Sequence, residues 1–482
     1  MNVLFVSSMR VYCRPEKPLH GQSAVLLGIS YISSSLKAAG HATRLLVLTP
    51  ETPKEVIDRT IRDFRPRLVC FTAFFSEYPF IAGIAGYIRQ QFPDLYLLGG
   101  GPHISLNADA VIRDCFDALC IGEGEQPTLE LVQQLEAGQT PSGIRNLWIK
   151  HGADVEKCPP RDFLQDLDSL PFPDRDMWQE WIEDPNTKPC VLLGRGCPFN
   201  CTYCCNHALR KLTEGEYVRF RSTDNVIAEL RQLTERLRGV RQVYFEVETI
   251  GANLDFAKHL CERLQEFNAG RAEPITFSVN LRVTPGCDYS RLFAAFKEAH
   301  FTLVNIGLES GSPRVRSEVL NRHYSNDDLL RAVERARQYG LKVALFVLLG
   351  LPGETRQDFQ ETVECTRRCQ PDECFLSIFT PYPGTVLYTR CEEMGLLDQG
   401  LDMRLERRRA ILDLPGFSRR QIQIEYLLFP YKVYKGRKPL PAVLKRVAKN
   451  WVRSSYVPNA VYKKLLASAA GRRFGRFIKR KR

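Results

Sequence analysis

Strand-like apolar segments alternate with helical segments along most of this 482-residue chain. In the first 140 residues, each expected strand is followed by a segment whose apolar residues have helical spacing. The strands are expected at residues 2–7, 41–48, 68–72, 95–98 and 116–121. Such alternation is typical of a parallel α/β sheet with helices on both faces, so residues 1–140 are predicted to form a doubly wound, Rossmann-like domain.

The alternation resumes over residues 190–395. Six further strands are expected, at residues 190–193, 240–245, 275–279, 302–307, 342–348 and 374–379. A closed TIM barrel needs eight strand–helix units, so six units predict a partial (β/α)6 barrel of the TIM type. Residues 141–189, which carry several prolines, are predicted to be a linker with one short strand at 144–149. Trp178 and Trp181 in this linker are expected to pack between the domains.

Glycines follow two strands of the first domain. In parallel α/β sheets, ligands bind at the carboxyl ends of the strands, and glycine there lets a large ligand approach the backbone. The chain lacks the dinucleotide fingerprint G-x-G-x-x-G after its first strand, where it has only Ser7-Ser8. The alternative is that these loops merely turn the chain. The candidate ligand-binding glycines are Gly99, Gly100, Gly101, Gly122 and Gly124.

Three cysteines in a C-x3-C-x2-C array, Cys197, Cys201 and Cys204, follow the first strand of the second domain. Active sites of such barrels lie at this end of the strands. Three thiolates can hold a [4Fe–4S] cluster by three of its irons and leave the fourth iron open to a ligand. The alternative is a structural metal site, for which His207 could supply a fourth ligand. Cys205 is a poorer fourth ligand, because adjacent cysteines point apart.

The array, with Tyr203 before its last cysteine, resembles the signature of radical S-adenosylmethionine (SAM) enzymes. The segments GLESGSPRVRSEVLNRHYS, LLGLPGET and TPYPGT resemble the cobalamin-dependent branch of that family. In addition, GISYISSSLKAAGHATRLL, LLGGGPHISLNADAVI and DALCIGEGEQPTLEL resemble the cobalamin-binding domain that precedes many of these enzymes, and LDSLPFPDRD resembles their connector. The resemblance implies three cofactors: a [4Fe–4S] cluster, SAM and cobalamin.

The resemblance also implies roles for individual residues. The three cysteines of the array would bind the cluster, and SAM would chelate its open iron and be cleaved to a 5′-deoxyadenosyl radical. Tyr203 corresponds to the aromatic residue beside the adenine, and Glu248 is the one carboxylate that remains of the acidic stretch after the second strand. Glu309 fits a polar contact to SAM, and Arg282 fits the SAM carboxylate or a plain salt bridge. Gly350 allows close approach of the backbone.

For cobalamin, the resemblance implies contacts to the glycines named above. The D-x-H-x-x-G motif that supplies a histidine to cobalt in the cobalamin mutases is absent. His103 is therefore expected to be a hydrogen-bonding loop residue, and cobalamin is expected to bind without a protein histidine on cobalt.

The function that this resemblance favours is a C-methyltransferase that acts on an unactivated carbon. An oxidative cyclase or rearrangement enzyme with the same cofactors is the first alternative, and a non-catalytic cobalamin or iron–sulfur sensor is the second. The expected partners are a reductant such as flavodoxin or ferredoxin and a small-molecule or lipid-like substrate. No RNA-binding module accompanies the chain, so nucleic acid is not expected as a partner.

The C-terminal extension, residues 396–482, is strongly basic. Residues 432–482 contain 17 Lys and Arg and no acidic residue, so the preceding 431 residues carry −5 of the chain's net +12. A charged helix is expected at 404–409, and an amphipathic helix with a basic face from Leu440 to Trp451. This helix could contact an anionic membrane or pack on the barrel. With no long apolar run or signal peptide, the chain is expected to be cytoplasmic, with peripheral contact to the inner face of the membrane as the further expectation.

Overall fold

The computed structural model describes residues 1–9, 15–237, 239–397 and 405–455, which divide into two units. The first unit is formed mainly by Met1–Leu281, with the short segments Ala294–Thr302 and Tyr382–Thr385. The second unit comprises Arg282–Phe293, Leu303–Pro381 and the chain from Val386 onward.

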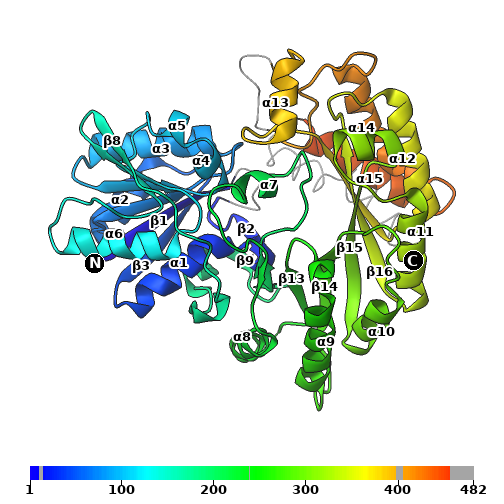
Figure 1. The fold of residues 1–482 in the computed structure, drawn as a ribbon, viewed down its shortest axis with the longest axis horizontal. Helices are drawn as coiled ribbons and strands as arrows, with labels where there is room; N and C mark the ends of the chain where they lie inside the picture. Colours follow the sequence, from blue (N-terminus) through cyan, green and yellow to red (C-terminus); the bar gives the residue numbers. More distant parts are fainter. Residues whose placement is uncertain (10–14, 238, 398–404, 456–482) are drawn as a thin grey trace, which may run out of the picture. The chain divides into compact units, whose positions relative to one another are not determined.

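The first predicted alternation forms a seven-stranded sheet in the order β3-β1-β4-β5-β6-β7-β8 (Figure 1). Its first five strands are parallel, as predicted: β1 (Asn2–Ser8), β3 (Ala42–Leu48), β4 (Leu68–Thr72), β5 (Tyr96–Gly100) and β6 (Ala118–Cys120). The last two, β7 (Leu147–His151) and β8 (Asp154–Lys157), form an antiparallel hairpin on β6. This hairpin comes from the segment predicted to be a linker, where only one short strand was expected.

Helices cover both faces of this sheet, because successive side chains of its strands alternate between two cores. Val3 and Phe5 of β1 pack in the core under α1 (Leu27–Ala38) and α6 (Glu125–Glu136). Leu4 and Val6 pack in the other core, under three helices. Those helices are α2 (Lys54–Phe64), α3 (Tyr78–Gln91) and α4 (Pro102–Leu106).

The linker is fixed to the first domain by buried polar contacts. Trp178 is 1% exposed in the core under α1, and its Nε1 donates to Ser30 Oγ at 2.8 Å. Asp174 accepts a hydrogen bond from Ser33 Oγ and pairs with Lys37 Nζ at 2.7 Å. These contacts place Trp178 within the core of the N-terminal domain, whereas the sequence had suggested packing between domains.

The six strands predicted for the barrel are all present and parallel to their neighbours. In the first unit β13 (Gln242–Glu246) lies between β10 (Cys190–Leu192) and β14 (Thr276–Leu281). In the second unit β16 (Lys342–Leu349) lies between β15 (Phe301–Glu309) and β17 (Glu373–Ile378). The helices that follow the strands are α8 (Thr223–Arg236), α9 (Leu254–Asn268), α10 (Ser290–Glu298), α11 (Asn326–Gln338), α12 (Arg356–Cys369) and α13 (Val386–Glu393). These repeats agree with the predicted (β/α)6 pattern.

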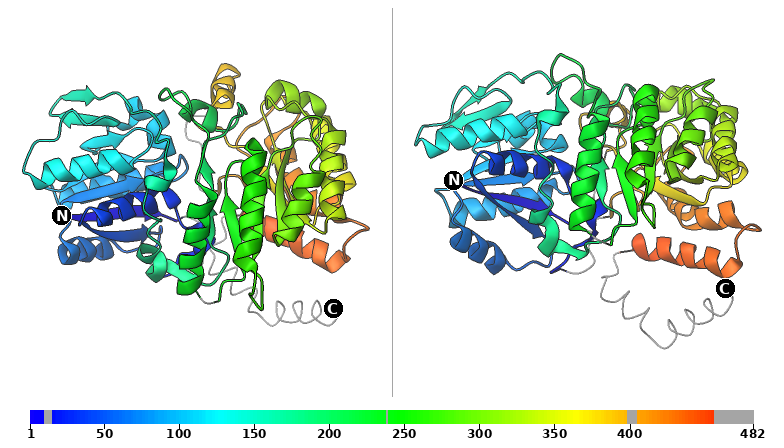
Figure 2. Two further views of the ribbon diagram at one scale, coloured as in Figure 1. Left: turned by 60° about the horizontal axis from the view of Figure 1, so that its bottom comes forward. Right: turned by 90° about the horizontal axis from the view of Figure 1, so that it is seen from below.

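Two further helices of the second unit, α14 (Arg419–Tyr434) and α15 (Leu440–Arg453), lie side by side (Figure 2). α15 confirms the predicted helix from Leu440. The charged helix expected at 404–409 is not formed over the described residues 405–409, which make turns, since Arg407 has a left-handed φ of 61°. The remaining basic tail, 456–482, lies outside the described residues. Within the ranges the structure describes, no helix is long and apolar enough to cross a membrane.

Candidate functional site

The cysteine loop begins and ends in a short two-stranded ribbon. β11 (Gly194–Arg195) directly precedes the loop and pairs antiparallel with β12 (Arg219–Phe220). A Cβ atom on Gly196 would lie 2.0 Å from the Tyr217 carbonyl oxygen, and Gly196 has a φ of 87°. A Cβ on Gly194 would lie 2.4 Å from the Arg219 carbonyl. Only glycine fits at both positions, so the sequence G-R-G is required for this close ribbon.

The three thiols of the array lie close enough to influence one another. Cys201 is buried, while Cys197 and Cys204 are half-buried. Burial raises the pKa of Cys197 to about 11, and the charges of Glu248, Cys201 and Cys204 add to this effect. A hydrogen bond from the neighbouring thiol Cys205 lowers the pKa of Cys204 to about 7. Cys204 is thus the thiol that most readily provides a thiolate.

Cys204 Sγ also faces two nitrogen donors. Both the backbone N and the side-chain Nδ2 of Asn206 lie 3.5 Å from it. Hydrogen bonds of this kind stabilise a thiolate, which is the form that binds iron. Across the described ranges, no three His, Cys, Asp or Glu side chains stand in the geometry of a metal site. The array therefore remains a predicted cluster site, supported by its spacing and its donor chemistry.

The structure gives His207 a structural role. It lies on α7 (Asn206–Leu209), is 8% exposed, and its Nδ1 donates to the Cys201 carbonyl at 3.1 Å. Burial lowers its pKa. This bond engages only one ring nitrogen, and metal-binding histidines commonly donate their other ring N–H in this way, so the alternative in which His207 is a fourth metal ligand stays open. Tyr203 lies between Cys201 and Cys204 and is half-buried.

The remaining residues predicted to contact SAM follow the carboxyl ends of the strands. In the first unit, Glu248 follows β13, is exposed, and is near enough to the array for its charge to act on Cys197. Arg282, the first residue of the second unit, follows β14, and its carbonyl accepts a hydrogen bond from the Tyr289 hydroxyl.

Within the second unit, Glu309 and Gly350 follow the neighbouring strands β15 and β16. Glu309 has a φ of 57°, and its Oε1 lies 3.4 Å from Arg322 Nη1. Gly350 has a φ of 80° and donates its N–H to Glu354 Oε2 at 2.6 Å. The two predicted residues are thus brought to one end of the same pair of strands, each with a carboxylate or arginine partner.

Glu354 is a residue of this region that the sequence did not single out. It is 1% exposed and accepts hydrogen bonds from the N–H groups of Gly350 and Leu351, while its Oε1 has no partner within the described part of the chain. Burial raises its pKa to about 8, although the two N–H groups oppose the shift. Glu354 is therefore mainly protonated at neutral pH and holds the Gly350 turn in shape.

A leucine in place of Glu354 is expected to weaken SAM binding by about tenfold, because the Gly350 turn loses two buried hydrogen bonds worth about 1 kcal/mol each. Glutamine can accept the same bonds, so Glu354→Gln should bind SAM like the wild type. Equilibrium dialysis with labelled SAM measures both variants. Equal affinities of the Leu and Gln variants would contradict the role given to the carboxyl group.

The same carboxyl group sets a pH dependence of stability. Its pKa rises on folding, so the folded state binds the proton more tightly. The free energy of unfolding should therefore be highest below about pH 4.5, fall as pH rises from there, and level off above about pH 8. The slope within this window is at most about 1.4 kcal/mol per pH unit. Urea unfolding of wild type and Glu354→Gln tests this, since the variant should lack that slope.

A second set of polar residues missed by the sequence lies on one face of β10, β13 and β14. Cys190, Tyr244 and Ser278 are register partners in one row across these strands. Asn280 Nδ2 donates to the Tyr244 hydroxyl at 2.6 Å, and Ser278 Oγ is buried without a partner among the described residues. Glu246 is on the same face as Tyr244, two residues along β13.

Burial raises the pKa of Glu246 to about 7, with a further contribution from Glu248. The opposite face of β13 carries Val243 and Phe245, both buried, and Phe245 stacks on Phe277 with ring centroids 5.1 Å apart. The polar face can therefore offer hydrogen-bond acceptors and donors to a bound molecule. The alternation of polar and apolar residues in Q-V-Y-F-E is the signal that could have identified it.

The glycines predicted to contact cobalamin lie at the carboxyl ends of two adjacent strands: Gly99 and Gly100 end β5 and Gly101 follows it, while Gly122 and Gly124 follow β6. Gly101 has a φ of 101°, and a Cβ there would lie 3.0 Å from Thr72 Oγ1. Gly122 has a φ of 87°, and its N–H donates to Ser105 Oγ at 3.0 Å. The backbone requires glycine at these two positions. At Gly100, the last residue of β5, a Cβ would make only ordinary contacts, the nearest with Cys120 at 3.7 Å.

The other two glycines are needed for packing. A Cβ on Gly99 would lie 3.1 Å from side-chain atoms of Ile104 and Leu119, and one on Gly124 would lie 2.8 Å from Ile32. At the end of the neighbouring strand β1, Ser8 Oγ is buried and lacks a partner among the described residues. A buried hydroxyl without a partner among the described residues, at the carboxyl edge of the sheet that carries these glycines, fits a large polar ligand such as cobalamin.

His103 lies on α4 and packs against two aromatic rings. Its ring centroid is 5.3 Å from that of Phe75 and 4.7 Å from that of Tyr78, and Asn107 Nδ2 donates to its Nδ1 at 3.2 Å. Burial lowers its pKa to about 4, so the ring is neutral. This environment agrees with the predicted hydrogen-bonding role.

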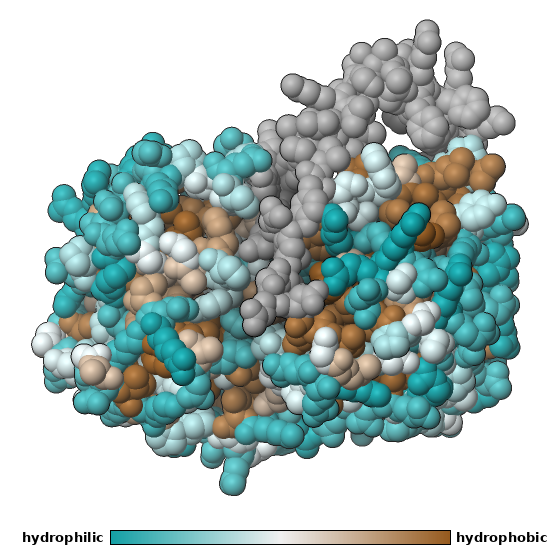
Figure 3. Space-filling view, turned by 90° about the horizontal axis from the view of Figure 1, so that it is seen from above, coloured by the Kyte–Doolittle hydropathy of each residue, from teal (hydrophilic) through white to brown (hydrophobic). Residues whose placement is uncertain are grey.

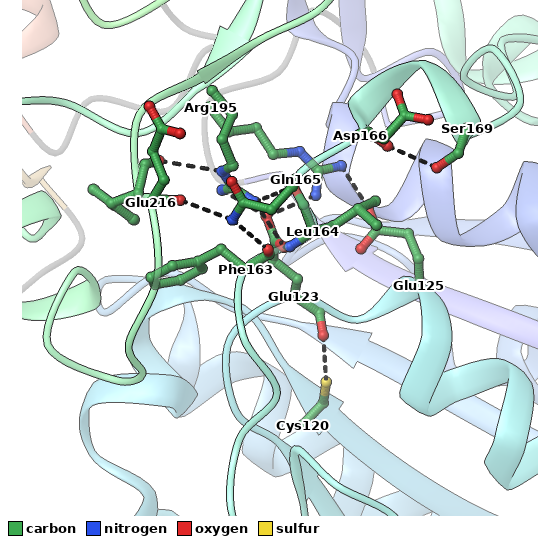
Figure 4. A network of polar contacts seen from close by, with 12 residues as sticks. Cys120, Glu123, Glu125, Phe163, Leu164, Gln165, Asp166, Ser169, Arg195 and Glu216 are labelled. Atoms are coloured by element: carbon green, nitrogen blue, oxygen red, sulfur yellow. Dashed lines mark hydrogen bonds and ion pairs between the residues drawn. The ribbon is translucent and has the colours of Figure 1, made fainter.

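A network of ion pairs that the sequence did not reveal joins the turn after β6 to the ribbon of the cysteine loop (Figure 4). Arg195 pairs with Glu123 at 3.0 Å and with Glu125 at 2.5 Å. Arg219 pairs with Glu123 at 2.9 Å and donates to the Leu164 carbonyl at 2.7 Å. The partners are about 70 to 96 residues apart in sequence, so no local pattern indicates them.

Family models match two parts of the chain. Residues 191–366 match the Radical SAM superfamily, and residues 21–132 match the B12 binding domain. An uncharacterized methyltransferase of Pyrococcus horikoshii is 28% identical over 77% of this chain and 79% of its own length. The hopanoid C-3 methylase of Methylococcus capsulatus is 25% identical over 94% of this chain and 88% of its own.

The chain is also similar to an enzyme of another kind. The anaerobic magnesium-protoporphyrin IX monomethyl ester cyclase of Rubrivivax gelatinosus is 24% identical over 76% of this chain and 66% of its own length. Two solved structures share the fold. TsrM, a radical SAM methyltransferase from Kitasatospora setae, covers 82% of this chain and 78% of its own, with a TM-score of 0.65 and 18% identity. OxsB, a cobalamin-dependent SAM radical enzyme, covers 98% and 75%, with a TM-score of 0.70 and 14% identity.

Proposed function

Because this chain is a radical SAM enzyme with a B12-binding domain in front of its radical SAM domain, we propose that it is a cobalamin-dependent C-methyltransferase. Its cofactors are a [4Fe–4S] cluster, SAM and cobalamin. The observation that carries the proposal is the presence, in one chain, of a three-thiol array and of glycine loops at the carboxyl edge of the sheet that precedes it. The methyltransferase and methylase relatives support the choice of reaction.

Different residues are proposed to hold the cluster and cobalamin. Cys197, Cys201 and Cys204 hold the cluster, and the loops with Gly101 and Gly122 hold cobalamin. When bound, the cluster and SAM supply the adenosyl radical that takes a hydrogen atom from the substrate carbon, and cobalamin supplies the methyl group.

The protein orients SAM and excludes water from the reacting carbon. In the first unit, Tyr203 would lie beside the adenine and Glu248 would bind the amino group of SAM. In the second unit, Arg282 would bind the carboxylate, and Glu309 and the Gly350 turn would bind other polar groups. A single-electron reductant such as flavodoxin or ferredoxin reduces the cluster.

Transfer of isotope from methyl-labelled SAM tests the reaction type. The reconstituted enzyme is incubated anaerobically with methyl-labelled SAM, dithionite and a small-molecule cell extract, and products are analysed by mass spectrometry. A methyltransferase should yield a product that carries the labelled methyl group. A new product without label would instead support an oxidative cyclase, which the relative from Rubrivivax gelatinosus brings into consideration. A fully loaded protein that releases no 5′-deoxyadenosine would support a non-catalytic sensor.

For the C-terminal helix we propose peripheral contact of a cytoplasmic enzyme with an anionic membrane. Leu440, Leu444 and Trp451 are 55%, 46% and 54% exposed and fall on one side of α15, since their spacings of four and eleven residues are close to whole helical turns. Val443 is buried instead. Figure 3 shows that exposed hydrophobic side chains gather in patches on one face of the molecule. An apolar stripe on a helix whose charged residues are all basic suits an anionic lipid surface and a lipid-like substrate.

Replacing Leu444 and Trp451 by serine is expected to reduce binding to vesicles with phosphatidylglycerol by at least about fivefold, because the apolar stripe loses two of the three exposed side chains named above. Liposome flotation measures the bound fraction. Leu254→Ser, which removes an equally exposed leucine from α9, is the matched control and should bind like the wild type. Unchanged flotation of the double variant would contradict membrane contact through α15.

A further inference from the structure

Two arginines face each other across the ribbon at the base of the cysteine loop. Arg195 of β11 and Arg219 of β12 are direct register partners. Like charges directly opposite each other destabilise a strand pair. The ribbon therefore needs anions between these side chains, and the shape of the cysteine loop depends on where the anions come from.

Both anions come from the turn after β6. Glu123 and Glu125 belong to the Gly122-Glu123-Gly124-Glu125 turn, whose glycines are predicted to contact cobalamin. Glu123 uses both oxygens: Oε1 accepts from both arginines, and Oε2 accepts from Arg219 and from the Leu164 N–H. Glu125 accepts from Arg195 alone. Two negative and two positive charges thus balance.

The side chains of the network are largely buried, so their charges interact more strongly than they would in water. The side chains of Arg219 and Glu125 are 4% and 9% exposed, and those of Arg195 and Glu123 are 17% and 22% exposed. Burial raises the pKa of Glu123, but the hydrogen bond from Arg219 and the charges of both arginines outweigh burial, and the net pKa lies below its usual value. Glu123 is therefore charged at neutral pH, and a shift of either side of the network would leave a buried charge without its partner.

The backbone on both sides has little freedom to absorb such a shift. Gly196, next to Arg195 and directly before Cys197, sits against the Tyr217 backbone with no room for a side chain. On the other side, the Gly122 N–H is fixed to Ser105 Oγ, and Glu125 opens α6. A change in the turn is thus passed through Arg195 to Gly196, the residue directly before the first cysteine of the array.

We propose that Arg195 is a positioning residue that couples cobalamin binding at the Gly122–Glu125 turn to SAM cleavage at the cysteine array. The inference rests on the proposed function, because it takes the turn as a cobalamin contact and the array as the cluster site. A ligand held by the turn would shift Glu123 and Glu125, these carboxylates would shift Arg195, and Arg195 would shift the ribbon from which the cysteine loop starts. This role differs from cofactor binding, because the groups that Arg195 contacts are the two carboxylates of the turn.

The test compares cobalamin-loaded with cobalamin-free protein. The full chain is reconstituted anaerobically with iron and sulfide, with or without hydroxocobalamin, and release of 5′-deoxyadenosine from SAM with dithionite is measured. Coupling between sites typically amounts to about 5- to 150-fold, so we expect the loaded wild type to be about tenfold faster than the free form. Arg195→Lys and Glu125→Gln should bring this ratio to within about twofold of one. The electron paramagnetic resonance spectrum of the reduced cluster should likewise change with cobalamin in the wild type and not in these variants.

A matched control replaces the guanidinium group of another arginine of the first unit. Arg89→Lys affects an ion pair with Asp117, whose side chains are 28% and 32% exposed and which lies at the other end of β6 from the turn. This variant should keep the wild-type ratio. If Arg195→Lys fails to retain iron, Glu125→Gln carries the test, because Glu125 pairs with Arg195 from the side of the turn.

The outcomes separate the inference from the function on which it rests. A wild-type ratio retained in both variants, or a rate lowered equally with and without cobalamin, would show that Arg195 only stabilises the fold. A wild type that binds cobalamin and cleaves SAM but shows a ratio of one would overturn the coupling and leave the proposed function standing. A wild type that binds no cobalamin, or cleaves no SAM when fully loaded, would overturn the proposed function itself.

Discussion

Cys201→Ala is expected to lower the release of 5′-deoxyadenosine by at least about 1,000-fold, because two thiolates do not hold a [4Fe–4S] cluster with an open iron. Cys201 is the most buried of the three array cysteines, with 7% of its surface exposed. Its carbonyl also accepts hydrogen bonds from the Cys204 N–H and from His207, and the alanine variant keeps both. The loop should therefore keep its fold while iron content falls.

The measurement is anaerobic reconstitution followed by iron analysis and chromatography of the SAM cleavage products. Cobalamin binding, followed by absorbance, should be unchanged, because the glycine loops lie in the preceding domain. Cys261→Ala is the matched control, since Cys261 is 1% exposed on α9 and belongs to the same unit. Full activity of Cys201→Ala would refute the cluster assignment, and loss of iron from Cys261→Ala would show that the assay reports stability instead.

Glu229→Gln is expected to lower the free energy of unfolding by about 3–5 kcal/mol, the usual cost of breaking a buried ion pair. Glu229 is 2% exposed and pairs with two buried arginines, Arg175 at 2.7 Å and Arg221 through its other oxygen. The arginines in turn donate to backbone carbonyls of β10, those of Cys190 and Leu192. The substitution leaves two positive charges without their carboxylate and loosens the strand that leads into the cysteine loop.

Thermal unfolding monitored by circular dichroism measures this loss, and iron retention after mild heating reports on β10. Asp176→Asn provides the comparison, because Asp176 and its partner Arg236 are 49% and 48% exposed. An exposed pair of this kind contributes about 0–1 kcal/mol. Equal losses from the two substitutions would mean that burial of the Glu229 network adds nothing to stability.

The local features of the fold could be predicted because the periodicity of the apolar residues and the spacing of the cysteines indicate them directly. Alternate burial of Val3, Leu4, Phe5 and Val6 is the pattern of a strand covered on both faces. The cysteine spacing likewise identifies the array without any tertiary information. In contrast, β8 was missed because Asp-Val-Glu-Lys is too polar to be identified as a strand by its own residues, and it exists through pairing with β7.

The long-range features of the site could not be predicted, since they depend on charges that meet only in the folded chain. Arg195 stands between two glycines, and its partners Glu123 and Glu125 flank a third, so nothing in their local sequence marks them as partners. Glu354 stood in a visible loop motif, yet its burial, which raises its pKa, follows from packing around the loop. These residues connect or support the predicted sites, which explains why spacing within a motif does not reveal them.

The β7–β8 hairpin determines how the N-terminal domain could be isolated as an autonomously folding fragment. A fragment ended at residue 140, where the alternation stops, would leave β6 as an edge strand with unpaired backbone groups, next to the turn that carries Glu123. It would also lose Asn146, whose backbone and side chain both bond Ile121. With the hairpin kept, β6 is an interior strand and the edge passes to the short, charged β8. Such edges resist intermolecular strand pairing, so a soluble fragment of this domain has to extend at least through Lys157.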